Sequence, residues 1–437
     1  MRPWLLAHDL WPALQPSLAA LALRLEPAGA WPGPGEAPVD PVLQHLRRAL
    51  LLRMLDAGPE SRRNVEVSGQ WQLLLDTEPI PGLPAALIEH WQSELRMAFC
   101  THELPGDGGK QRGRDLRERH QAGAMLGELG DNIRYERRAV GKHWGLRLRD
   151  ALWATVGRPG ELTKHLIGSP PEDALASEYE RPVCETPPMP CYQVARLPVT
   201  VGEWRRFAEA EGYADVEALH WRAAGSAAQE WLRRSARPYQ LPAMTRAACN
   251  QTLQPMCDIT VYEAVAYAAW ISGAAAFRGA NDSASVSYQV PNELQWEAAM
   301  RCDVGGQPPQ HHHIWLHQPG NVAPGALDFN YAKCGLGLTA VGLFSRGYSQ
   351  AGLADGSGNV WDWCCNAVPA GGLAGWGQPG AIEVAQLPWA PEDSDSLRSL
   401  RGGAFAITAG HCRPAFRILE PAAYFSGDIG LRLVHLV

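Results

Sequence analysis

The spacing of apolar positions differs between the first 190 residues and the rest of the chain. The first part carries helix-like apolar patterns, which predict helices over 42–55 and 84–99 and a longer one over about 115–156. Within the longest, apolar residues recur at every fourth position and would form one stripe along a helix: Val140, Trp144, Leu148 and Leu152. Beyond Tyr192 short apolar runs alternate with glycine-rich loops, which predicts short strands and few helices.

Two helices are expected in the second part, over 200–212 and 260–272. Each begins with a threonine that has a glutamate three residues later, the arrangement of a capping box. Between the two parts, residues 169–190 are rich in proline and acidic residues, which predicts a linker. We therefore expect a mainly α-helical N-terminal domain of unknown role at 1–168, a linker at 169–190 and a loop-rich domain at 191–437.

The composition is that of a globular protein, since 46% of the 437 residues are hydrophobic and 19% are charged. The net charge of −7 is spread over both parts, so a general nucleic-acid binder is not expected. The stretch 110–149 is rich in lysine and arginine; a solvated helix face accounts for it, and an anionic partner such as a nucleic acid is the alternative. Ten cysteines without a CxxC pair predict buried free thiols.

No apolar run is long enough to span a membrane, so no membrane span is expected. The first six residues resemble the start of a signal peptide, but His8, Asp9 and Pro12 interrupt the apolar stretch and no clear cleavage site follows. We expect a cytoplasmic protein or one carried by a phage particle.

Five blocks beyond Tyr192 match one known family in order. They read LPVTVGEW, QPMCDITVYEAVAY, YQVPNELQWEAA, GLADGSGNVWDW, and RGGAF followed by IGLRL, and they lie at 197–204, 254–267, 288–299, 352–363, and 401–405 with 429–433. They resemble the formylglycine-generating-enzyme (sulfatase-modifying factor) family. The resemblance implies an α+β fold of the C-type-lectin-like type with little regular secondary structure. Trp361 and Trp363 share one face of the expected strand and are predicted to lie in the core.

The oxidase of this family holds copper between two cysteines in the segment that follows Arg-Gly-Gly. Counting from Arg401, those positions are occupied by Ile407 and Cys412. An isoleucine cannot ligate a metal, and a lone thiolate does not reproduce a two-thiolate site. The resemblance therefore predicts that formylglycine-generating chemistry has been lost and that no catalytic residue is present.

The sequence offers three other possible metal sites. Sulfoxide synthases of the same superfamily bind non-haem iron through three histidines of an N-terminal helical bundle, but His90, His120 and His143 occur singly here and are expected to be structural. The run 311–313 is expected to be a solvated loop. Family members often bind calcium near the Asn-Val-Trp block, where the candidate ligands are Asn359 and Asp362; no dense acidic cluster surrounds them, so no cofactor is assigned.

A second branch with this fold comprises the variable proteins of diversity-generating retroelements, in which adenine-directed mutagenesis turns Asn codons into NNY. The segment of about 404–433 is similar to the mutated segment of those proteins. The resemblance implies that Arg413, Arg417 and Arg432 fix the backbone and that the intervening side chains face solvent. Residues 404–437 contain no Trp, Met or Gln, which NNY cannot encode.

The predicted function is non-catalytic binding of a variable protein or another macromolecular ligand. The predicted ligand-binding residues are Ala406, Ile407, Thr408, His411, Pro414, Phe416, Ile418, Leu419, Ala423, Tyr424, Phe425, Ser426, Gly427 and Asp428. Exposed apolar and aromatic side chains would form a patch typical of a binding surface. Three alternatives stay open: Phe416, Ile418 and Phe425 belong to the core, the chain is a metal-dependent enzyme with a non-standard site, or the segment mediates oligomerisation.

Overall fold

The computed structural model describes residues 116–131, 133–140, 143–208, 212–235, 251–273, 287–303, 314–316, 323–368, 389 and 397–437, together with individual residues between 89 and 99. The chain divides into two compact units, 1–98 and 99–437. Each described residue between 89 and 99 is helical, in agreement with the helix predicted over 84–99. The helix predicted over 42–55 lies outside the described residues.

The long helix predicted over about 115–156 is wrong beyond its first third. Helix α7 (Leu116–Leu129) is followed by a hairpin of β1 (Tyr135–Val140) and β2 (His143–Leu148), then η1 (Asp150–Leu152) and β3 (Trp153–Val156). An interval of four residues is also two periods of a strand, so a stripe at every fourth position fits both structures.

One four-stranded sheet contains strands from both ends of residues 153–437. Its order is β3–β8–β14–β9, with β8 at Tyr192–Ala195, β14 at Val434–Leu436 and β9 at Tyr288–Gln289. All its neighbouring strands are antiparallel, and Val434 stands opposite Val194. Because β3 belongs to this sheet, the folded region includes residues upstream of 191.

Residues 169–190 form structure where a linker was expected. Strand β6 (Cys184–Glu185) pairs with β5 (Leu166–Ile167), and β7 (Met189–Pro190) pairs with β4 (Leu162–Thr163). The 3-10 helix η2 (Glu178–Glu180) has a capping box from Ser177. The acidic residues that suggested a solvated linker include Asp173 and Glu180, which are buried.

A second sheet holds the predicted variable segment. Its order is β12–β11–β10–β13, with β10 at Trp361–Val368, β11 at Leu397–Arg401, β12 at Arg417–Pro421 and β13 at Ile429–Gly430. Strands β10, β11 and β12 are antiparallel, and β13 runs parallel to β10. The predicted segment thus leaves the sheet after β11 and returns to it as β12 and β13.

The two predicted helices begin where the capping boxes place them. Helix α8 (Val201–Arg206) follows Thr200, whose side chain accepts from the Glu203 N–H, and α11 (Val261–Gly273) follows Thr260 in the same way. Three further helices were not predicted: α9 (Leu219–Ala224), α10 (Ser226–Arg234) and α12 (Glu293–Arg301). Short 3-10 turns complete the elements at Ala332–Cys334 (η6), Ser345–Gly347 (η7) and Ala409–Cys412 (η8).

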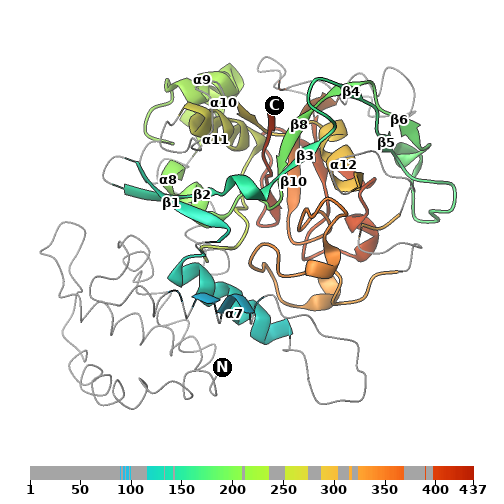
Figure 1. Cartoon of the computed structure of the whole chain (residues 1–437). Coiled ribbons are helices and arrows are strands. Elements are labelled where there is room, and N and C mark those ends of the chain that lie inside the picture. Colours follow the sequence, from blue (N-terminus) through green and yellow to red (C-terminus); the bar gives the residue numbers. More distant parts are fainter. Residues whose placement is uncertain are drawn as a thin grey trace, which may run out of the picture. The chain divides into compact units, whose positions relative to one another are not determined.

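Helices α9, α10 and α11 lie on one side of strands β8 and β10, and α12 lies on the other (Figure 1). Trp361 and Trp363 are buried in the aromatic-rich core that includes α11, which confirms their prediction as core residues. Trp296 and the other apolar residues of α12 pack in a second core with residues of β3 and β8. Among the described residues, no helix has the length and apolar character needed to cross a membrane.

Candidate binding surface

A glycine turn starts the predicted segment. Gly402 and Gly403 follow β11 with φ of +91° and +77°, a region that side-chain-bearing residues rarely adopt. A Cβ on Gly403 would lie 2.6 Å from the Cys412 Sγ and 2.9 Å from its Cα. The turn therefore depends on glycine, and it brings the backbone at Gly403 close to Cys412.

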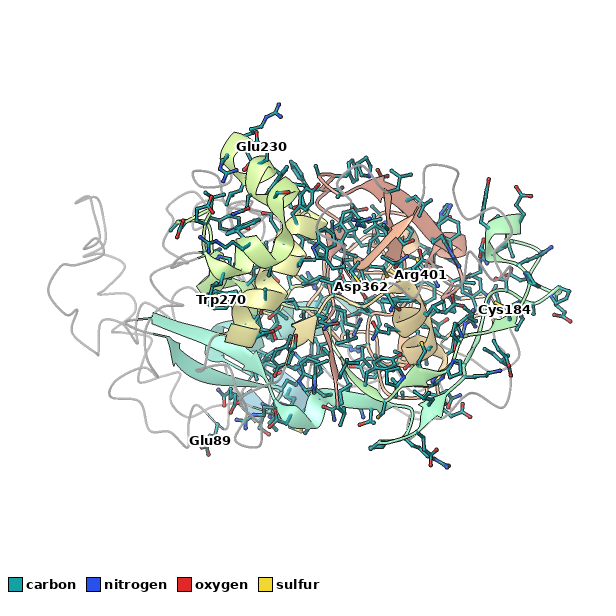
Figure 2. The ribbon with its side chains drawn as sticks, turned by 90° about the horizontal axis from the view of Figure 1, so that it is seen from above. Glu89, Cys184, Glu230, Trp270, Asp362 and Arg401 are labelled. Atoms are coloured by element: carbon teal, nitrogen blue, oxygen red, sulfur yellow. The ribbon has the colours of Figure 1, made fainter. Side chains whose placement is uncertain are left out.

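Four buried arginines, Arg401, Arg413, Arg417 and Arg432, bind the segment to the interior of the domain. Arg401 donates to the carbonyls of Ala415 and Phe416 at 2.8 and 3.0 Å and forms an ion pair with Glu297. Arg417 forms an ion pair with Glu293 at 2.9 Å. Figure 2 shows Arg401 and Asp362 in the interior of the domain, whereas Glu230 projects from its outer surface.

Arg432 connects the end of the segment to three other parts of the fold. Its guanidinium donates to the Ala195 carbonyl at 2.9 Å, the Ala354 carbonyl at 2.7 Å and the Asp362 Oδ2 at 3.1 Å. Asp362 also accepts from the Trp296 Nε1 at 2.9 Å. This one side chain therefore connects β8, β10 and the 352–359 loop.

Arg413 binds two buried carboxylates of the region predicted as a linker. Its Nη1 lies 2.5 Å from the Asp173 Oδ2 and 2.6 Å from the Glu180 Oε2. Its Nη2 donates to the Leu175 carbonyl at 3.1 Å, and its Nε donates to the Gly410 carbonyl at 2.9 Å. The expected role of the arginines as backbone anchors matches this geometry.

Side chains at the predicted ligand-binding positions reach the surface between these anchors. Six are exposed: Ala406, Thr408, His411, Ala423, Tyr424 and Phe425. Seven are half-buried: Ile407, Phe416, Ile418, Leu419, Ser426, Gly427 and Asp428. Pro414 departs from the prediction because it is buried between Arg413 and Ala415, so it contributes nothing to this surface.

The aromatic side chains divide between core and surface. Tyr424 and Phe425 are each 43% exposed, so the alternative that places Phe425 in the core is wrong. Phe416 and Ile418 pack their inner faces against the core while remaining half-buried. The His411 ring meets the Phe416 ring edge-on, with centroids 4.6 Å apart, and the His411 Nδ1 lies 3.0 Å from the Thr408 Oγ1.

The positions that correspond to the copper cysteines have apolar surroundings. Cys412 is buried with Trp315, Phe329 and Tyr331, and Ile407 packs against the same cluster. Burial raises the pKa of the Cys412 thiol to about 12, so the thiol is protonated at neutral pH. Because the thiolate is the metal-binding and nucleophilic form, this arrangement does not favour either chemistry.

The candidate calcium ligands are engaged by protein donors. The Asn359 Oδ1 accepts from the Asn330 Nδ2 at 3.1 Å and from the Thr339 N–H at 3.2 Å. The Asp362 Oδ2 accepts from Trp296 and Arg432, as described above. Within the described part of the chain, no group of three or more His, Cys, Asp or Glu side chains is placed to hold a metal ion.

The histidines discussed above as possible metal ligands lie on separate elements where the structure describes them. His120 lies in α7 and His143 in β2, whereas His90 and the run 311–313 lie outside the described residues.

Stability is expected to depend on pH through Glu297. Burial opposes ionisation, but the charges of Arg401, Arg301 and Arg417 outweigh it and hold the pKa of Glu297 at about 2, below the ordinary 4.5. Its contribution is therefore complete above pH 4.5 and is lost as the pH falls through the folded-state pKa. We expect about 3 kcal/mol of unfolding free energy to disappear across this window.

Urea unfolding at neutral pH and at about pH 3, for the wild type and Glu297→Gln, measures this contribution. The variant should lose less stability on acidification than the wild type does. An equal acid-dependent loss in both proteins would show that Glu297 is not the group responsible.

Comparison with known proteins gives a family match over most of this region. A family model described as the sulfatase-modifying factor enzyme 1-like domain matches residues 165–437, more than half of the chain. Hercynine oxygenase from Mycolicibacterium thermoresistibile is 29% identical over 257 residues, which make up 56% of this chain and 51% of that protein. The chain thus spans about half the length of this relative.

Two solved structures are similar at low sequence identity. PvdO from Pseudomonas aeruginosa is 19% identical with a TM-score of 0.44, over 65% of this chain and 94% of that one. Treponema denticola variable protein 1 is 16% identical with a TM-score of 0.42, over 69% of this chain and 99% of that one. The family match and the mixed strands and helices of 165–437 confirm the α+β fold expected from the resemblance.

Proposed function

The chain belongs to the sulfatase-modifying factor enzyme 1-like family, and from that premise we propose that it is a non-catalytic recognition protein that binds macromolecular ligands through residues 406–428. The observation that carries the proposal is that the segment combines buried arginines with side chains that reach the surface. Arg401, Arg413 and Arg432 are buried and bonded to distant parts of the fold, whereas thirteen of the fourteen predicted ligand-binding residues between them are exposed or half-buried. Such a framework tolerates new side chains at the surface positions.

The proposal includes diversification by a retroelement. The exposed residues are Ala, Thr, His, Tyr and Phe, and each of them has an NNY codon. The residues at 413, 417 and 432, predicted to fix the backbone, are buried arginines, as is the residue at 401. A mutagenesis that changes only the exposed positions would alter ligand choice without removing the buried ion pairs.

The surface composition favours protein ligands. Tyr424 and Phe425 are exposed next to each other, and aromatic side chains supply much of the binding energy in protein interfaces. The pair of thiolates that the family's oxidase needs is replaced by Ile407 and the protonated thiol of Cys412. Recognition therefore accounts for this region better than copper chemistry does.

Panning a phage-displayed library of random peptides on the purified chain tests the proposal. We expect enriched peptides to bind the wild type and to lose about tenfold or more in affinity when Tyr424→Asp and Phe425→Asp are introduced together. Leu219→Asp is the matched control, because Leu219 is 82% exposed on α9, outside the segment. Peptides that bind both variants equally would contradict a recognition role for residues 406–428.

An oxygenase is the second candidate function, because the curated relative is a hercynine oxygenase. The chain would then bind a metal through residues other than the Ile407 and Cys412 pair. Stoichiometric iron in the purified chain, together with oxygen consumption that requires hercynine, would support this function. If the iron-reconstituted chain consumes no oxygen with hercynine, the oxygenase candidate is excluded.

A further inference from the structure

We propose that Leu175 is a constant apolar anchor of the binding surface, and that its partner is a protein surface with an apolar centre and a basic rim. The inference rests on the proposed function and adds a binding residue outside the predicted variable segment. It concerns residues 169–181, which we call the strap.

Leu175 has a solvent-exposed apolar side chain on a backbone that is fixed by hydrogen bonds. It is 60% exposed, yet both of its backbone polar groups are bonded. Its N–H donates to the Asp173 Oδ1 at 3.0 Å, and its carbonyl accepts from the Arg413 Nη2 at 3.1 Å. Because the strap is fixed in this way, placing Leu175 against a partner orders little additional backbone.

The same side chain adjoins the predicted variable segment. A methyl group built on Gly410 would lie 3.6 Å from the Leu175 Cδ1, so the leucine covers the backbone of η8. Gly410 stands between the exposed residues Thr408 and His411, and the His411 ring rests against Phe416. Leu175 therefore extends the surface of the segment with a residue that lies outside 406–428.

The charge around Leu175 indicates the kind of partner. Glu172 and Glu178 are exposed on the strap on either side of the leucine. Beneath it, the positive charge of Arg413 is paired with the buried carboxylates of Asp173 and Glu180, so Arg413 adds no cation to the rim. An acidic rim around an apolar residue complements a partner with basic side chains around an apolar one.

A constant anchor also suits a surface whose other side chains change. A few central apolar residues supply most of the affinity of a protein interface, and the surrounding contacts select among partners. Leu175 would give every variant the same apolar contact, while positions such as Thr408 and His411 determine which partner is bound.

The test uses the full-length chain and peptides enriched from the phage-displayed random library. Affinities for the wild type, Leu175→Asp and the milder Leu175→Ser are compared, with Leu219→Asp as the matched control. We expect the enriched peptides to contain lysine or arginine around an apolar residue. We also expect affinity to fall about tenfold or more for Leu175→Asp and less for Leu175→Ser, with no change for Leu219→Asp. Unchanged melting temperatures would show that both Leu175 variants remain folded.

The outcomes separate this inference from the proposed function. If the Tyr424→Asp and Phe425→Asp double variant loses binding while both Leu175 variants bind as the wild type does, the anchor is overturned and the recognition function stands. Enriched peptides without basic residues would overturn the basic rim of the partner. If neither Leu175 nor the aromatic pair affects binding, both proposals fail.

Discussion

Replacing Arg413 with methionine is expected to lower the free energy of unfolding by about 3–5 kcal/mol, because it leaves two buried carboxylates without their cation. Asp173 and Glu180 are both almost fully buried, and Arg413 is the side chain that forms ion pairs with both. The Leu175 and Gly410 carbonyls would also lose a donor. Urea unfolding followed by fluorescence measures the loss.

Arg158→Met is the matched control for this substitution. The ion pair of Arg158 with Glu161 is exposed on both sides, and exposed pairs contribute about 0–1 kcal/mol. A destabilisation of Arg413→Met as small as that of the control would show that the strap is not held by this network.

Replacing Arg432 with methionine is expected to cost about 3–5 kcal/mol for a related reason. The substitution leaves the buried Asp362 with the Trp296 indole as its remaining donor, and it removes the donor from the Ala195 and Ala354 carbonyls. Adding Asp362→Asn removes the uncompensated charge. We therefore expect the double variant to be more stable than Arg432→Met alone, in thermal or urea unfolding. A double variant less stable than Arg432→Met would show that the Asp362 charge is not the source of the cost.

Short sequence patterns predicted those features that depend only on residues close together in the chain. The Thr-x-x-Glu pattern located the starts of α8 and α11, because a capping box needs residues three apart. The signal failed for β1 and β2, where a stripe at every fourth residue did not distinguish a helix from a hairpin. It also missed α9 and α10, which Gly225 divides into segments too short for a clear period.

The partners of the arginines could not be predicted from the sequence. Arg413 binds Asp173 and Glu180, which lie more than 230 residues earlier in the chain. A proline-rich acidic stretch has the composition of a linker, and only the fold shows that two of its carboxylates are buried. Glu293 and Glu297, by contrast, lie in one of the blocks that carry the family resemblance, although their pairing with Arg417 and Arg401 was not apparent.

Under the proposed function, this arrangement lets one segment combine a fixed backbone with replaceable side chains. The anchors are long cations that reach inward to carboxylates of the strap, α12 and β10, so the exposed side chains contribute little to holding the segment. Substitutions of surface residues that lack such contacts change stability by roughly 0.5 kcal/mol or less. A fold of this kind can present many different surfaces at nearly constant stability.

Deep sequencing of codons 397–437 of the gene across a culture, with a search of the neighbouring DNA for a near-identical repeat, tests the central claim most directly. The account predicts variation confined to codons 406–428, opposite adenines of that repeat, with the exposed positions from Ala406 to Phe425 changing and Arg413 and Arg417 constant. A uniform segment with no repeat nearby, or variation that reaches the buried arginines, would contradict it.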